Sequence, residues 1–201
     1  MRRILSLCDY SGEWARPYLE AGYDVTLVDP KHVHNIAGKP NKYAMTVQEF
    51  LATATKGQFH GILAAPPCTD FAVSGARWFA EKDASGDTEL SLEIVDACLD
   101  IIDRIDPAWW ALENPVSRLT RLRPLRLGRP RLIFDPCDYG DPYTKKTCLW
   151  GWFNADLPLR PVEPIEGSKM WSRYGGKSDR TKELRSITPA GFARAFFEAN
   201  P

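Results

Sequence analysis

The stretch RILSLCDYSGEWARPYLEAGYDVTLVD, Arg3 to Asp29, establishes the fold class. Its first five residues form a short, mainly apolar run that predicts a strand. GEWARPYLEAG then has the composition of a helix closed by Gly22, and DVTLVD predicts a second strand that ends on an acid. A strand, a helix and a strand in this order indicate the start of a sheet whose strands are mainly parallel.

The same alternation continues toward the C-terminus. Further strands are predicted at 59–65, 108–114, 131–136 and 146–151, and further helices at 46–54, 88–105 and 188–200. In the last helix, Thr188 is expected as the N-cap and Pro189 at the first helical position. We therefore predict an α/β fold with a doubly wound, mainly parallel sheet, in one domain spanning residues 1–201.

The overall composition indicates a soluble protein with one core. Of the 201 residues, 44% are hydrophobic, and no run of about 18 apolar residues predicts a membrane span. The apolar run at the N-terminus is too short for a signal peptide, so a cytoplasmic location is expected. Five cysteines without a Cys-x-x-Cys pair argue against a disulfide framework and a thiolate zinc site, and we expect no metal.

Charge is balanced over the chain but unevenly distributed along it. The stretch 117–131 holds six arginines and no acid, and 169–185 is mostly basic, with a Trp and a Tyr interleaved. By contrast, 81–106 is strongly acidic. Each run alone is compatible with a solvated face, but two basic segments on a neutral chain favour one positively charged surface that binds nucleic acid.

Polar groups follow the predicted strands, where ligands bind in sheets of this class. The loop LCDYSG follows the first strand, and Asp29 ends the second, where a carboxylate accepts hydrogen bonds from ribose hydroxyls. Only Gly12 interrupts this loop, which does not favour a phosphate cradle. The pattern is better suited to a non-phosphorylated nucleoside ligand such as S-adenosylmethionine.

A cysteine stands at the end of a later strand, in GILAAPPCTDFAVSG. Pro66 and Pro67 restrict the backbone and remove two amide donors, so Cys68 is presented in a loop of defined direction. A cysteine that only packs in the core is the alternative. The strand WWALENP likewise ends on a carboxylate, Glu113, which places a thiol and an acid on the same rim of the sheet.

These motifs resemble those of the DNA cytosine-5 methyltransferases. PPCTDFAVSG is similar to the family's nucleophile motif and LENP to its Glu-Asn motif. DYGDPYTKKTCLWG and LRSITPAGFAR resemble later motifs of the family, in the same order over nearly the whole chain. The resemblance implies a Rossmann-like fold that uses S-adenosylmethionine and releases S-adenosylhomocysteine.

The resemblance also implies roles for individual residues. Cys68 would add to C6 of a cytosine flipped out of the duplex or already single-stranded, and Glu113 would stabilise the ring through N3. Lys145 stands where the family has the first arginine of its Gln-x-Arg-x-Arg motif. The cofactor site would include Cys8, Asp9, Tyr10, Gly12, Trp14, Asp29 and Pro66.

The chain departs from the family most clearly in size. A short, basic, Pro/Gly-rich segment at about 151–185 stands in place of a target-recognition domain. This implies a compact, phage-like enzyme of a bacterium or an infected host cell. Its sequence specificity would be relaxed, or a protein partner would supply it. The expected DNA contacts, mainly to phosphates, are Ser74, Arg77, Arg118, Arg121, Arg123, Lys169, Arg173 and Lys177. Methylation of RNA or a free nucleotide, and a binding module without activity, are the alternatives.

Overall fold

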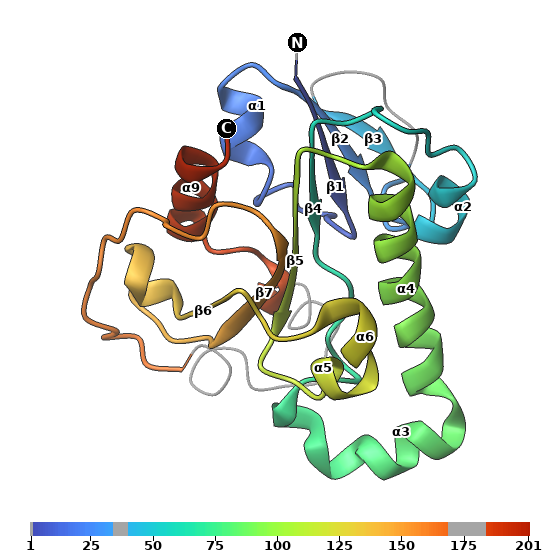
Figure 1. Cartoon of the computed structure of the whole chain (residues 1–201). Coiled ribbons are helices and arrows are strands. Elements are labelled where there is room, and N and C mark those ends of the chain that lie inside the picture. Colours follow the sequence, from blue (N-terminus) through green and yellow to red (C-terminus); the bar gives the residue numbers. More distant parts are fainter. Residues whose placement is uncertain (1, 34–39, 169–183) are drawn as a thin grey trace.

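A seven-stranded sheet forms the centre of the computed structural model, which describes residues 2–33, 40–168 and 184–201 (Figure 1). The strand order is β3-β2-β1-β4-β5-β7-β6. The strands are β1 (Arg3–Leu7), β2 (Asp24–Val28), β3 (Asn41–Tyr43), β4 (Gly61–Ala64), β5 (Trp109–Pro115), β6 (Leu132–Phe134) and β7 (Thr147–Trp152). The predicted mainly parallel α/β sheet is confirmed, although the short β3 was not predicted.

One strand runs against the others. The five strands from β3 to β5 pair in parallel, whereas β7 is antiparallel to β5 and to β6. In this register Ala64 lies opposite Leu112, and Pro115 lies opposite Thr147. The carboxyl ends of β1, β4 and β5 therefore share one edge of the sheet with the beginning of β7.

Helices cover both faces of the sheet. They are α1 (Arg16–Glu20), α2 (Val47–Leu51), α3 (Phe79–Ser85), α4 (Asp87–Ile105), α5 (Leu119–Leu122), α6 (Pro124–Leu127) and α9 (Ala190–Ala199), with 3-10 turns η1 (Val73–Trp78) and η2 (Pro136–Tyr139). Figure 1 shows α1 and α9 together on one side, and α2, α4 and α6 on the other. The doubly wound arrangement is thus confirmed. None of the helices in the described ranges combines the length and the apolar composition needed to cross a bilayer.

Each face of the sheet has its own core. On the α4 side, Leu92, Val95, Leu99 and Ile102 recur at helical spacing and are buried. Full burial of one such side chain stabilises the fold by about 1.5–3 kcal/mol, so the helix is held by its apolar face.

The opposite face has an aromatic core that corrects one expectation. Trp14, predicted beside a cofactor, is fully buried, with its ring centroid 5.9 Å from that of Phe192 and 5.7 Å from that of Phe196. Both phenylalanines belong to α9. The indole therefore fastens the C-terminal helix to the sheet, and it lies too deep to line a site on the surface.

The start of α9 also differs from the prediction. The helix begins at Ala190, after Pro189 as the N-cap, and Thr188 makes no cap hydrogen bond. Instead, the N–H of Gly191 donates to Asp141 Oδ2 at 2.9 Å, which satisfies a free donor of the first turn. A Cβ at Gly191 would lie 2.0 Å from the carbonyl oxygen of Tyr139, so only glycine permits this close approach to η2.

Candidate active site

A buried asparagine links the two strand ends that carry the predicted thiol and acid. Asn114, fully buried near the end of β5, donates from Nδ2 to the carbonyl oxygen of Pro66 at 3.1 Å. Its Oδ1 has no hydrogen-bond partner among the described residues. Since β4 and β5 are neighbours in parallel, this bond holds the exit of β4 beside Glu113.

The loop after Pro67 turns sharply at Cys68. The Cys68 carbonyl oxygen accepts hydrogen bonds from the N–H groups of Phe71 at 3.0 Å and Ala72 at 2.9 Å. Burial raises the pKa of the Cys68 thiol, the charge of Lys145 lowers it, and Glu113 raises it. The thiol is therefore mainly protonated in the free protein, and the ammonium favours its ionised form.

Glu113 and Lys145 form a close pair at the same edge. Lys145 Nζ lies 4.0 Å from Glu113 Oε1, and the two side chains are only 11% and 14% exposed, respectively. Burial raises the pKa of Glu113, and the ammonium of Lys145 opposes this effect. A carboxyl group whose pKa is raised in this way is better suited than an ordinary glutamate to donate a proton to a ligand atom.

Lys145 reaches this edge because β7 is antiparallel. It lies two residues before β7, whose first residue pairs with the last residue of β5. Its N–H donates to Asp135 Oδ1 at 2.9 Å, and its Nζ donates to the carbonyl oxygen of Arg185 at 2.9 Å. The structure thus brings Cys68, Glu113 and Lys145 together, and their catalytic roles stay predictions.

The loop after β1 is organised by Asp9. This nearly buried carboxylate accepts hydrogen bonds from Ser6 Oγ at 2.8 Å, Ser11 Oγ at 3.2 Å and the N–H of Gly12 at 2.7 Å. Cys8 and Gly12 both have positive φ angles, +57° and +72°. Asp9 therefore shapes the loop, and the strained Cys8 suits a constrained binding loop.

Asp29 lies beside this loop, at the end of β2. Its Oδ1 accepts from the N–H of Lys31 at 2.8 Å, and burial raises the pKa of its carboxyl. The half-exposed ring of Tyr10 lies 5.5 Å from the ring of His32, measured between centroids.

His32 was not predicted from the sequence as a site residue. It is 7% exposed, and its Nε2 has no hydrogen-bond partner among the described residues. The only feature of the sequence that pointed to His32 was its place three positions after Asp29, the acid that follows a predicted strand.

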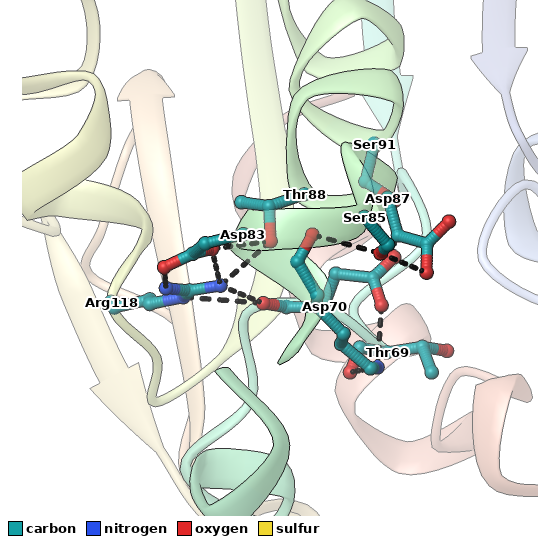
Figure 2. Close-up of polar contacts among 9 residues, drawn as sticks. Thr69, Asp70, Asp83, Ser85, Asp87, Thr88, Ser91 and Arg118 are labelled. Atoms are coloured by element: carbon teal, nitrogen blue, oxygen red, sulfur yellow. Dashed lines mark hydrogen bonds and ion pairs between the residues drawn. The ribbon is translucent and has the colours of Figure 1, made fainter. Parts of the chain in front are cut away.

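Two arginines predicted to contact phosphates are engaged inside the molecule. The guanidinium of Arg118 is 7% exposed and donates to both carboxylate oxygens of Asp83 at 2.8 Å (Figure 2). Arg123 pairs with Asp96 at 2.9 Å and with Glu89 at 3.1 Å. The acids of α3 and α4 thus pair with Arg118 and Arg123, which reduces the charge that both offer to a DNA backbone, and their DNA contacts stay predictions.

The other predicted DNA contacts fall into two groups. Ser74, Arg77 and Arg121 are exposed, and the guanidinium of Arg77 lies 5.1 Å from the ring centroid of Trp78. Lys169, Arg173 and Lys177 lie outside the described residues.

Comparison with solved structures identifies the fold. The chain is similar to a protein described as a DNA modification methyltransferase encoded within an E. coli prophage, at 13% identity and a TM-score of 0.52, over 81% of this chain and 53% of that one. The fold is that of a Rossmann-like methyltransferase. No protein-family model and no curated protein sequence matches the chain.

Two further solved structures are similar. They are the Entamoeba histolytica methyltransferase EhMeth (14% identity, TM-score 0.49, 89% of this chain and 61% of that one) and the S. pombe Dnmt2 methyltransferase (15%, 0.46, 75% and 48%). The chain thus spans about half to three fifths of the length of these three proteins. In folds of this class ligands bind beyond the carboxyl ends of the parallel strands, which is the edge that carries Cys68 and Glu113.

Proposed function

We propose that the protein transfers a methyl group from S-adenosylmethionine to C5 of cytosine in DNA. The observation that carries this proposal is the meeting of a thiol, a carboxyl group with a raised pKa and an ammonium group at the ligand-binding edge of a methyltransferase fold. The Glu113–Lys145 distance of 4.0 Å supports concerted action of the last two groups on one ring.

The loops after β1 and β2 fit the proposed cofactor by their chemistry. The Asp29 carboxylate has one oxygen bonded to the N–H of Lys31, which leaves acceptor capacity for ribose hydroxyls. The half-exposed ring of Tyr10, which lies near the His32 ring, provides an apolar surface in the same loop region. S-adenosylmethionine, when bound, supplies an electrophilic methyl group on a sulfonium.

The residues of the chain provide the rest of the chemistry. The Cys68 thiolate adds to C6 of cytosine, which makes C5 nucleophilic, and protonated Glu113 donates a hydrogen bond to N3 as charge builds on the ring. Lys145 favours the thiolate. Methyl transfer to C5 leaves S-adenosylhomocysteine. A base, for which water is a candidate, then takes the C5 proton while the C6–S bond breaks, which restores the aromatic ring and releases Cys68 as a thiolate.

The substrate is proposed to be a cytosine that is flipped out of the duplex or is already single-stranded, since C5 is inaccessible inside a duplex.

We propose further that residues 1–201 form one catalytic domain, in which the segment at about 151–185 replaces a target-recognition domain. In this proposal the enzyme either reads a short or relaxed site or takes its specificity from a protein partner. Internal pairing of Arg118 and Arg123 reduces the charge available for a nucleic-acid backbone, which favours a free cytosine nucleotide as the second candidate substrate.

A methyl-incorporation assay tests the proposal. Labelled S-adenosylmethionine is offered with double-stranded DNA, single-stranded DNA, RNA or a cytidine nucleotide. We expect label at C5 of cytosine in DNA, loss of transfer in Cys68→Ser, and retained transfer in Cys137→Ser, whose thiol lies in η2. DNA containing 5-fluorocytosine should trap a covalent adduct on Cys68, located by mass spectrometry. Full activity of Cys68→Ser, or an adduct on another cysteine, would contradict the mechanism.

A further inference from the structure

The loop that carries Cys68 is fastened by side chains from outside the loop (Figure 2). Lys82, in α3, donates from Nζ to the carbonyl oxygen of Thr69 at 2.9 Å and to Asp70 Oδ1 at 2.5 Å. Ser91, in α4, donates to the other oxygen of the Asp70 carboxylate. The two residues after Cys68 are thus bonded to two successive helices.

Arg118 holds the same loop from the other side. Its Nε and one Nη donate to the carbonyl oxygen of Asp70 at 3.3 and 3.1 Å. The same Nη also donates to Asp83 Oδ1 and Thr88 Oγ1, and the other Nη donates to Asp83 Oδ2, each at 2.8 Å. The guanidinium also lies 3.8 Å from the ring centroid of Phe79. One buried cation therefore joins the loop to α3 and α4.

The backbone reinforces this connection. The N–H of Arg118 donates to the carbonyl oxygen of Phe71 at 3.2 Å, and the N–H of Val73 donates to that of Val116 at 3.3 Å. Ala72 and Ser117 form an antiparallel bridge between these two bonds. The segment after Cys68 is consequently held against the segment after Glu113, and Arg118 is the residue at which the backbone and side-chain contacts meet.

We propose that Arg118, Asp83 and Lys82 form a clasp that positions the Cys68 loop. In this arrangement Arg118 is a positioning residue, which acts through the Asp70 carbonyl and does not touch the substrate. The clasp rests on the proposed function for its role in catalysis, but its effect on the thiol is independent of any methyl transfer.

The two partners of the central ion pair differ in exposure, which suggests where to perturb it. The Asp83 side chain is 51% exposed, whereas that of Arg118 is 7% exposed. Asp83→Asn therefore keeps the shape of an accessible side chain and weakens the hold on the buried guanidinium. A matched control exists on α4, because Asp96→Asn removes a carboxylate partner of Arg123 in the same way without contact to residues 68–73.

The test measures the alkylation rate of each cysteine by iodoacetamide at pH 8, resolved by peptide mass spectrometry. In Asp83→Asn, water and reagent reach the loosened loop, so the rate at Cys68 should rise at least about threefold, the change in thiolate fraction produced by half a pKa unit. The rate at Cys137 should not change. Asp96→Asn should leave the rates at both cysteines as in the unmodified protein.

Methyl transfer provides the second readout. A displaced nucleophile loop should lower kcat by about tenfold or more, with unchanged affinity for S-adenosylmethionine. Lys82→Gln releases the Thr69 carbonyl from the opposite side of the loop, and it should likewise raise the alkylation rate of Cys68 and lower kcat. It replaces Asp83→Asn in the test if that variant fails to fold. Unchanged Cys68 alkylation in both variants, or equal effects of Asp96→Asn, would overturn the clasp. A protein without methyl transfer that still shows the alkylation difference would overturn only the proposed function.

Discussion

At the scale of single residues, the site depends on one positive charge near two partly buried titratable groups, the Cys68 thiol and the Glu113 carboxyl. Burial raises the pKa of both Cys68 and Glu113, and Lys145 is the cation that lowers each of them. The lysine stands where the resembled family has an arginine, and it points a single ammonium at Glu113 in place of a planar guanidinium. Its replacement therefore removes the one charge that acts on both groups.

Lys145→Ala should raise the pKa of both groups further, because the favourable charge is lost while burial remains. The pH midpoint of Cys68 alkylation should move upward, and methyl transfer should fall by about a hundredfold, as when one stabilising donor is removed from an active site. Lys146→Ala is the control, since that side chain is 64% exposed and lies 3.7 Å from Asp135. Equal behaviour of the two variants would show that Lys145 has no electrostatic role.

At the scale of elements, α3 is attached to the Cys68 loop by charge. Figure 2 shows Asp83 and Thr88 on either side of the α3–α4 junction, both directed at Arg118. The exposed outer face of α3 gives it little apolar contact of its own, and none of its residues is buried. The position of this helix therefore responds to the protonation of Asp83.

A pH dependence follows from this arrangement. Hydrogen bonds and charge from Arg118, together with Thr88, lower the pKa of Asp83 to about 2, from an ordinary value near 3.8. A carboxyl with a lowered folded-state pKa contributes stability above its unfolded pKa and loses it as pH falls through the folded value. The difference in Tm between the unmodified protein and Asp83→Asn should be largest above about pH 4 and should shrink toward pH 2. A difference that stays constant from pH 5 to pH 2 would contradict this assignment.

At the scale of the whole molecule, the basic and acidic runs of the chain neutralise each other. Arg123 pairs with Glu89 and Asp96, and Arg126 pairs with Asp100 and Asp103, all on α4. These contacts join the segment after β5 to the long helix that precedes β5. Part of the balanced charge of the chain is therefore paired within the molecule, at partly exposed side chains.

Charge reversal distinguishes an arginine that pairs with α4, Arg123, from an arginine at an exposed position, Arg121. Arg123→Glu should lower stability by about 1 kcal/mol, because it places a carboxylate against two acids, and added salt should reduce the loss. Arg121→Glu, at an exposed position, should change Tm less and should weaken DNA binding with a shallower salt dependence. Thermal unfolding and binding titrations at several salt concentrations check both outcomes. If Arg123→Glu lost DNA affinity without loss of stability, the pairing with α4 would be contradicted.

Local pattern was sufficient for the fold class and for the edge on which the candidate site lies. Apolar runs, helix periodicity and turn residues concern neighbours along the chain, so they predict strands such as β1 and β5 and the residues that follow them. The parallel arrangement of β4 and β5 then places Cys68 and Glu113 on one rim, as the sequence predicted.

The three-dimensional arrangement was needed for everything that depends on partners distant along the chain. The insertion of β7 antiparallel between β5 and β6 brings Lys145 to Glu113, and no local pattern encodes strand order. Arg118 and Arg123 belong to a basic run in sequence, but folding brings them within hydrogen-bond distance of acids 27 to 35 positions away. Trp14 is buried because α9 packs on it. The chemistry of a side chain determines which groups it can bind. The packing of segments distant along the chain determines which of those groups it contacts.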